Sequence, residues 1–194
     1  MTSTILVDKV LSDVVCNHLI NASVEQIDIA SWLSTMNEDE FRRCCPLDHI
    51  SCGMTSRDDG KKILLHIETI GHALMIQRYV EEVATAELCK MISLTDAFTP
   101  NGSTRVGVVW TLSVKRIDDR SCELTNSMVV HPTAEFMEFI AQHKIKFIDA
   151  VGGRQHVEGE HNRRETPLMA DSIERLVIAQ ARQGGRSVGA ARSN

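Results

Sequence analysis

The feature that most constrains this chain is the alternation of apolar and polar residues in two consecutive runs. In the first run, "VGVVWTLSVKRI", one face carries Val106, Val108, Trp110, Leu112 and Val114. The second run, "CELTNSMVV", repeats the alternation after the short polar segment "DDRS". A period of two residues is typical of strands with one buried face, and short turns join antiparallel neighbours. The two runs therefore predict an antiparallel hairpin with one face in the core.

Turn signals and apolar runs extend this pattern back toward residue 49. Asp-Gly in "RDDGK" and Asn-Gly in "TPNGSTR" supply the backbone conformations that tight turns require. The runs between them include "KKILLHIETIG", "HALMIQRYVEEVAT" and "ELCKMISLTDAF". We expect residues 49–131 to form one antiparallel meander.

The N-terminal part predicts one strand and two short helices. Residues 6–21 read as a weak strand region. Ser23 is suited to cap a helix that extends to Leu33, and Asn37 is suited to cap a second helix over 37–45.

The C-terminal part predicts two helices separated by a loop. The first spans 134–150 and ends at the glycine pair 152–153. Residues 154–165 are polar throughout, which indicates a connecting loop. Pro167 fits the first turn of a further helix, and residues 183–194 lack apolar anchors, which predicts a disordered tail.

Length and charge narrow the class of protein. A chain of 194 residues is sufficient for one domain with a sizeable core. The formal net charge of -5 argues against nucleic acid as a partner, and no apolar run is long enough to span a membrane. None of the six cysteines forms a CxxC pair, and no signal peptide is evident. We expect reduced thiols in a cytoplasmic protein.

The order of elements resembles the helix-grip fold of the SRPBCC superfamily, which includes START domains, polyketide cyclases and birch-pollen-allergen-like proteins. The resemblance rests on "HLINASVEQIDIASWL" and on "TRVGVVWTLSVKRIDDRSCELTNSMVV" followed by the helix from Ala134. It implies an α+β fold in which a curved antiparallel sheet wraps around a long C-terminal helix, here with an extra C-terminal helix. We expect a ligand-binding domain over 1–153, a polar loop and helix packed on it over 154–182, and the tail over 183–194.

The resemblance also implies a cavity between the sheet and the long helix. Alternation places Trp110 and Asn126 on the cavity face, as ligand-binding candidates. In "LMIQRYVEE" the same alternation turns Arg78 and Glu82 inward as catalytic candidates, with Glu82 as the base. The other register turns Gln77, Tyr79 and Glu81 inward, and Tyr79 is kept as a ligand-binding candidate.

Two histidine–glutamate pairs have spacings that suit proton transfer or metal binding. His66 and Glu68 are two apart, on one face of a strand, and are candidate ligand-binding residues. In "HVEGEHNRRE", His161 and Glu165 are four apart, as are His156 and Glu160. This pattern is similar to the zinc-dependent C–C hydrolases of acylphloroglucinols, a branch of the same fold. His161 and Glu165 are therefore catalytic candidates, although we expect no metal and no cofactor.

These features favour an enzyme of secondary metabolism that acts on a hydrophobic, aromatic or polyketide-like molecule. The expected reaction is cyclisation, isomerisation or hydrolysis by acid–base chemistry. A non-catalytic carrier or sensor of a lipid-like ligand is the alternative, and a zinc-dependent C–C hydrolase of the acylphloroglucinol type is a second alternative. The expected partner is a small molecule, and a homodimer is possible.

Overall fold

The computed structural model describes residues 4–190, with side chains as far as residue 181. Its main element is a seven-stranded antiparallel sheet in the order β1-β7-β6-β5-β4-β3-β2. The strands are β1 (Ser12–Ile20), β2 (His49–Ser56), β3 (Lys62–Ile70), β4 (Ala73–Ala84), β5 (Leu88–Thr99), β6 (Gly102–Arg116) and β7 (Cys122–Pro132). The meander expected over 49–131 is thus confirmed, because β2 to β7 pair in chain order.

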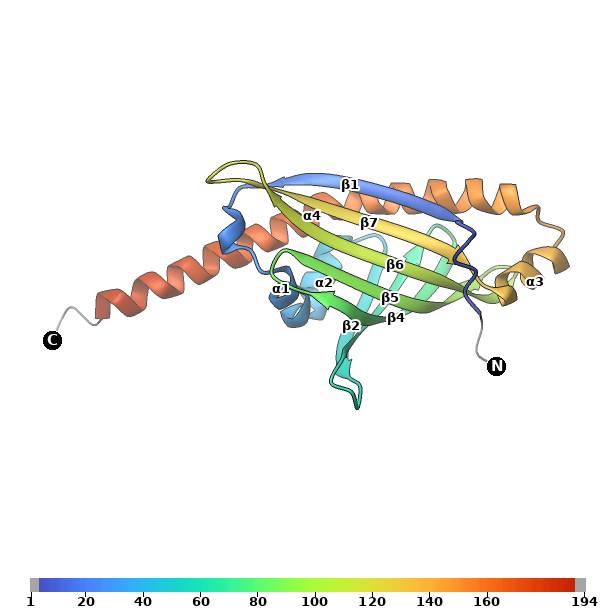
Figure 1. The fold of residues 1–194 in the computed structure, drawn as a ribbon, viewed down its shortest axis with the longest axis horizontal. Coiled ribbons are helices and arrows are strands. Elements are labelled where there is room, and N and C mark those ends of the chain that lie inside the picture. Colours follow the sequence, from blue (N-terminus) through green and yellow to red (C-terminus); the bar gives the residue numbers. More distant parts are fainter. Residues whose placement is uncertain (1–3, 191–194) are drawn as a thin grey trace.

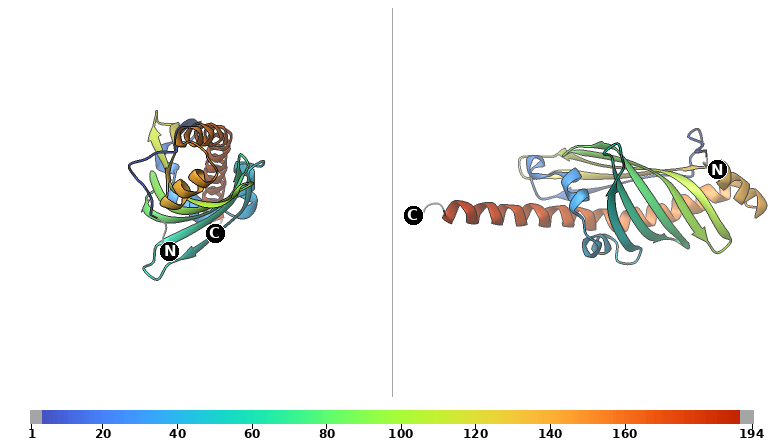
Figure 2. Two further views of the ribbon diagram at one scale, coloured as in Figure 1. Left: turned by 90° about the vertical axis from the view of Figure 1, so that its right-hand side faces the viewer. Right: turned by 90° about the horizontal axis from the view of Figure 1, so that it is seen from below.

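The sheet curls around one long helix. This helix, α4 (Phe147–Ala190), runs along the concave side of the sheet, as two views of the ribbon show (Figures 1 and 2). A shorter helix, α3 (Ala134–Gln142), lies at one end of the sheet, with Thr133 as its N-cap. The N-terminal helices α1 (Ile29–Thr35) and α2 (Glu38–Cys44) lie nearer the other end and pack on α4. This arrangement is the expected α+β helix-grip fold.

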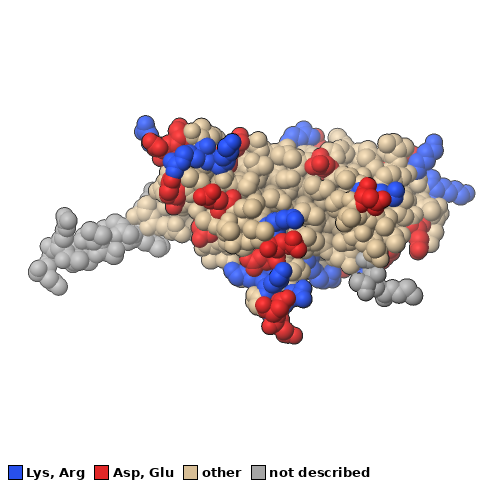
Figure 3. All heavy atoms as spheres, viewed as in Figure 1, with Lys and Arg blue, Asp and Glu red and all other residues tan. Residues whose placement is uncertain are grey.

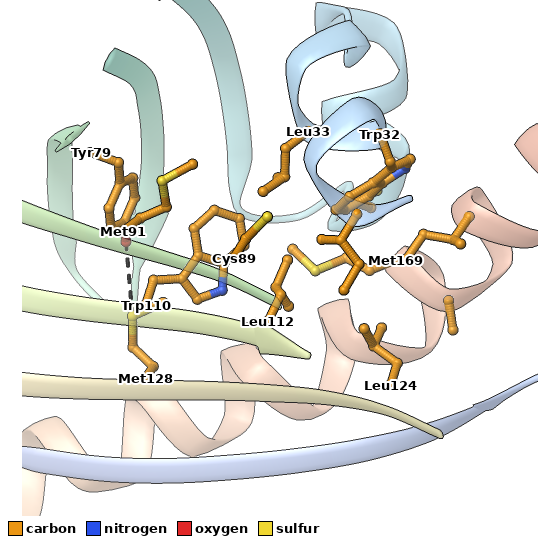
Figure 4. Close-up of a cluster of buried hydrophobic side chains, with 14 of the residues drawn as sticks. Trp32, Leu33, Tyr79, Cys89, Met91, Trp110, Leu112, Leu124, Met128 and Met169 are labelled. Carbon is orange, nitrogen blue, oxygen red and sulfur yellow. Dashed lines mark hydrogen bonds between the residues drawn. The ribbon is translucent and has the colours of Figure 1, made fainter. Parts of the chain in front are cut away.

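The core lies between the concave face of the sheet and the inner face of α4. Figure 4 shows side chains from β4, β5, β6 and β7 that point toward Met169 of α4 and toward Trp32 and Leu33 of α1. The indole nitrogen of Trp32 donates a hydrogen bond to Ser172 Oγ at 2.9 Å, which joins α1 to α4. The inner face of α4 is therefore fixed against the sheet.

The C-terminal helices differ from the sequence prediction. The helix expected over 134–150 is interrupted after Gln142, where Lys144 adopts a positive φ of 56°, and α4 then begins at Phe147. Residues 154–165, expected to be a loop, are helical, because α4 continues through Gly152, Gly153 and Pro167. Packing of α4 inside the sheet outweighs the local preference of glycine and proline against helix interiors. The tail expected to be disordered over 183–194 lies beyond the described side chains, but its backbone continues α4 as far as Ala190, and residues 191–194 lie outside the described part.

The outer surface carries charges of both signs. On the face shown in Figure 3, Lys and Arg side chains lie beside Asp and Glu side chains and do not gather into a patch of one sign. Among the described residues, no helix combines the length and the hydrophobicity that a membrane crossing requires.

Candidate metal centre

Two strands and one helix bring four metal-binding side chains together inside the sheet. His49 begins β2 and pairs in register with Glu68 near the end of β3. His161 and Glu165 lie one turn apart on the inner face of α4. All four side chains are at most 5% exposed. The fold thus buries two imidazoles and two carboxylates at one point.

The four side chains direct one atom each toward a common centre. His49 Nε2 lies 3.3 Å from Glu68 Oε2 and 3.4 Å from Glu165 Oε2. His161 Nε2 lies 3.4 Å from Glu68 Oε2 and 3.5 Å from Glu165 Oε2. Ordinary N–H···O hydrogen bonds span about 2.7–3.2 Å, so all four separations are longer than that. Ligand atoms around a zinc ion with bonds near 2.0–2.2 Å lie about 3.3–3.6 Å apart in a tetrahedral site, and the four histidine–glutamate separations are close to that spacing.

Short hydrogen bonds behind the four ligands fix their orientation. His49 Nδ1 donates to the carbonyl oxygen of Phe41 at 2.6 Å, and His161 Nδ1 donates to Asp48 Oδ2 at 2.8 Å. Both acceptors lack a hydrogen to donate, so each Nδ1 carries one, and each ring in its neutral form would present its Nε2 lone pair to the centre. Partners of this kind are typical of metal-bound histidines.

Hydrogen bonds and ion pairs also hold Glu165 and Asp48, the hydrogen-bond partner of His161, in place. Asn126 Nδ2 donates to Glu165 Oε1 at 2.9 Å, which leaves Oε2 free to face the centre. Asp48 is also paired with Arg164, whose side chain is 41% exposed. The charge of Asp48 is therefore balanced outside the centre, and the two glutamates need two positive charges of their own.

Either two protons or one divalent cation can supply those charges. Burial alone would lower the pKa of His49, but its contacts with Glu165 and Glu68 raise that pKa to about 10. Burial opposes ionisation of His161 as well, yet the same two glutamates hold its pKa well above the ordinary value. The pKa values of Glu68 and Glu165 are lowered by the imidazoles despite burial. The protein alone therefore carries two imidazolium protons here, and one divalent ion can replace both.

A small cavity of about 10 Å³ lies among these ligands. This volume suits one water molecule or one metal ion. Its walls include His66, Gln77, Tyr79 and Trp110 from the sheet. Burial lowers the pKa of His66 to about 4, and this ring packs against Phe41 and Trp110 as a neutral wall residue.

A second group of metal-binding residues shares His161. It consists of Cys45, Asp48 and His161, and Cys45 Sγ lies 3.8 Å from His161 Nδ1. That nitrogen already donates to Asp48, so it has no lone pair for a metal. The group of His49, Glu68 and His161, whose ligand atoms all lie within 4.8 Å of one another, is the better site, and Glu165 completes it.

The structure brings most of the candidates named from the sequence to this centre. Glu68, His161 and Glu165 face it directly, and His66, Tyr79 and Trp110 line its cavity. Asn126 does not face the centre directly but contacts residues that do. Its Oδ1 accepts from Trp110 Nε1 at 2.9 Å, and its Nδ2 donates to Glu165. The exposed His156 is not part of the centre.

The inward orientation expected for Arg78 and Glu82 is wrong. Arg78 is exposed and pairs with Asp96 at 2.7 Å, and Glu82 pairs with Lys90 at 3.6 Å on the outer side. The other register holds for Gln77 and Tyr79, which are each 1% exposed. A register shift between Glu81 and Val83 means that strict alternation does not extend along the whole of β4.

Sequence reasoning missed His49 and Asp48. Both lie in "CCPLDHI", between the end of α2 and the start of β2. The only hint in the sequence was an aspartate followed by a histidine where a strand begins. The residues near them in the structure, Glu68 and His161, are distant in the sequence and are brought close by the fold. Arg154 and Glu158, which lie on the inner face of α4, were missed because their segment was expected to be a loop.

A curved antiparallel sheet closed around a long helix, with polar groups inside, defines the helix-grip class. Among solved structures, the Zhui aromatase/cyclase from Streptomyces sp. R1128 matches with a TM-score of 0.59 at 11% identity, over 89% of this chain and 97% of that one. The di-domain ARO/CYC StfQ from the steffimycin biosynthetic pathway matches with a TM-score of 0.58 at 12% identity, over 84% of this chain and 51% of that one.

A START superfamily protein from Mycobacterium smegmatis matches with a TM-score of 0.51 at 13% identity, over 84% of this chain and 98% of that one. No protein-family model and no curated protein matches the sequence. The chain thus shares the fold of these aromatase/cyclases and of this START superfamily protein, and likenesses at this identity show the fold alone.

Proposed function

We propose that this protein is a zinc-dependent hydrolase of a small aromatic ketone. The observation that carries the proposal is the set of four nitrogen–oxygen separations of 3.3–3.5 Å among His49, Glu68, His161 and Glu165. Two imidazoles and two carboxylates form a donor set that suits zinc, and one divalent cation neutralises the charge of the two carboxylates. The His-x-x-x-Glu pair on the long helix is similar to that of zinc-dependent acylphloroglucinol hydrolases, which supports the choice of reaction.

Zinc bound at such a centre would supply a water of near-neutral pKa and an electrophile for a carbonyl oxygen. The residues of the chain hold and surround this chemistry. Asp48 and the Phe41 carbonyl orient the two imidazoles, and Asn126 orients Glu165. The rings of His66, Tyr79 and Trp110 exclude bulk water from the cavity.

The overall reaction is the addition of water across an aryl–carbonyl bond. The C–C bond between the ring and the carbonyl carbon breaks, the carbonyl carbon gains hydroxyl as a carboxylic acid, and the ring carbon gains a proton. The Tyr79 hydroxyl is placed to hold a polar atom of the substrate, because it is fully buried and donates only to the sulfur of Met128, at 3.8 Å (Figure 4). A thioether is a weak acceptor, so a substrate oxygen would be a better partner.

A metal-free cyclase or a carrier is the second candidate. The aromatase/cyclase fold of two matched structures favours it. However, Glu82, the base expected for metal-free chemistry, lies on the outer side of the sheet. Of the other buried carboxylates, Glu68 and Glu165 are at the proposed zinc centre, and Asp48 and Glu158 are already paired with His161 and Arg154, respectively.

Metal analysis of the purified protein tests the proposal. We expect one zinc ion per chain by inductively coupled plasma mass spectrometry, and loss of both zinc and hydrolysis of 2,4,6-trihydroxyacetophenone in His161→Ala. His156→Ala is the matched control, because His156 is exposed on the same helix five residues away. Full hydrolytic activity in metal-free protein would refute the proposal. The metal-free cyclase would then be the better explanation of the site.

A further inference from the structure

A separate pocket of about 270 Å³ lies at the α3 end of the sheet. Most of its lining is apolar and comes from α3, α4 and the strand ends, including Met75, Phe136 and Val157. Pockets for drug-sized ligands measure about 300–1,000 Å³, so this one suits a smaller occupant.

Buried polar groups with incomplete hydrogen bonding lie on α4 between this pocket and His161 of the metal centre. Arg154 lines the pocket, and its Nε has no hydrogen-bond partner among the described residues. Its Nη1 faces only the sulfur of Met75, at 4.0 Å. Arg154 forms an ion pair with Glu158, but Glu158, which is 1% exposed, has no well-oriented hydrogen bond at Oε2.

Gln77 provides an independent observation from the sheet. Its side chain is 1% exposed and lines the cavity of the metal centre, yet neither its amide nitrogen nor its oxygen has a partner among the described residues. An unpaired buried amide destabilises the folded protein, and a ligand that pairs with it removes that penalty. A donor and an acceptor are thus available beside the metal centre.

The pocket and the metal centre lie in sequence along the same structural elements. Met75 of the pocket and Gln77 of the centre are two residues apart on the inner face of β4. Arg154 and His161 are seven residues apart on α4, which corresponds to about 10 Å of helix. A single ring with short substituents can span this distance.

We propose that the pocket, together with Gln77, Arg154 and Glu158, is the specificity subsite of this enzyme. The apolar pocket takes the body of a one-ring ligand, Arg154 and the Gln77 amide nitrogen donate to its acceptor oxygens, and Glu158 or the Gln77 oxygen accepts from its hydroxyl. The assignment of these residues to a substrate rests on the proposed function, whereas their role in binding does not require the metal.

Calorimetric titration with 4-hydroxyacetophenone tests the subsite, on zinc-loaded and metal-free protein. Gln77→Leu removes the amide at similar volume, and the double variant Arg154→Met/Glu158→Met replaces the ion pair without leaving one charge buried alone. We expect each to weaken binding at least tenfold. The Tm should stay unchanged or rise, because Gln77→Leu removes an unpaired polar group and the double variant replaces a buried ion pair with apolar side chains. Arg163→Met, an exposed arginine of the same helix, is the control and should change the Kd less than twofold.

Two ligand controls complete the test. 4-Ethylphenol, which lacks the carbonyl, should bind more weakly and lose little affinity in Gln77→Leu, and 6-acetyl-2-naphthol, with two rings, should be excluded by size. A Kd within twofold of the unmodified protein in both variants, or a fall in Tm with unchanged Kd in Gln77→Leu, would overturn the proposal. Binding that depends on these residues in a protein that takes up no zinc would uphold the subsite and refute the hydrolase.

Discussion

Two clusters of charged side chains in this protein, one exposed and one buried, differ in the distances between their opposite charges. On the outer face of the sheet, Asp96 accepts from Arg78 and Arg105 at 2.7 and 2.8 Å, and both arginines are at least 38% exposed. Inside, the nitrogen–oxygen separations among the four buried ligands are longer, at 3.3–3.5 Å. The side chains of the outer cluster hydrogen-bond to one another directly at the exposed surface. The inner side chains are too far apart for ordinary hydrogen bonds, and an ion fits between them. We therefore expect substitutions in the inner cluster to change stability and metal binding strongly, and substitutions in the outer cluster to change stability only slightly.

The largest effect is expected from removal of one inner carboxylate. Glu68→Ala leaves two imidazoles facing one glutamate in a buried site, and breaking a buried charge pair in this way typically costs about 3–5 kcal/mol. Urea unfolding should show a loss in this range, together with loss of zinc from the purified protein. A loss below about 1 kcal/mol with zinc retained would mean that Glu68 is not a ligand.

A smaller effect is expected from the partner behind His161. Asp48→Asn keeps the shape but replaces the carboxylate that accepts from His161 Nδ1. Such changes behind a ligand typically weaken metal affinity 10–100-fold, so competition with a chromogenic chelator should show a decrease in this range. Asp39→Asn, at an exposed position of α2, should leave the affinity unchanged. Equal affinity in both variants would show that Asp48 does not orient the ligand.

The helical state of the segment expected to be a loop can be tested by stabilisation. A Cβ added at Gly152 or Gly153 meets no atom within 4 Å. Because alanine favours helix interiors over glycine by about 0.5–1 kcal/mol, each change to alanine should raise the free energy of unfolding by that amount. No gain, or a decrease, would argue that these residues are not in a helix.

The smallest effect is expected at the outer cluster. Burial alone would raise the pKa of Asp96, but hydrogen bonds from Arg78 and Arg105 lower it. Its contribution to stability is therefore present above the unfolded pKa of about 3.9 and is lost as the pH falls through the lower folded value. Because the arginines are exposed and screened, Asp96→Asn should cost less than about 1 kcal/mol at pH 7, with no difference from the unmodified protein at the lowest pH. A loss above 2 kcal/mol would contradict the contrast between the clusters.

The sheet was predictable because its signal is local and repeated. Alternation in β6 and β7 and turn residues before β3 and β6 lie within a few positions of one another in the sequence. The register of β4 was not predictable, since Arg78 and Glu82 alternate with apolar residues as regularly as Gln77 and Tyr79 do. The deciding factor is pairing with β3 and β5, which sequence periodicity does not contain.

The metal centre was predictable only in part, for a similar reason. The spacing of four residues pointed to His161 with Glu165, although their segment was expected to be a loop, and the spacing of two pointed to Glu68 with His66 on one strand face. His49 lies far from them in the sequence and joins them through the pairing of β2 with β3. The continuity of α4 also depends on packing, since glycine and proline residues favour interruption. Contacts between distant segments thus determine the missing parts of the site.

X-ray absorption at the zinc edge tests the central claim most directly, because it separates the two groups of metal-binding residues that share His161. If His49, Glu68, His161 and Glu165 hold the ion, the spectrum should show four nitrogen or oxygen neighbours at about 2.0–2.1 Å, with the multiple scattering of two imidazoles. A sulfur neighbour at about 2.3 Å would place the ion at Cys45 instead and contradict the account, as would a protein that binds no zinc.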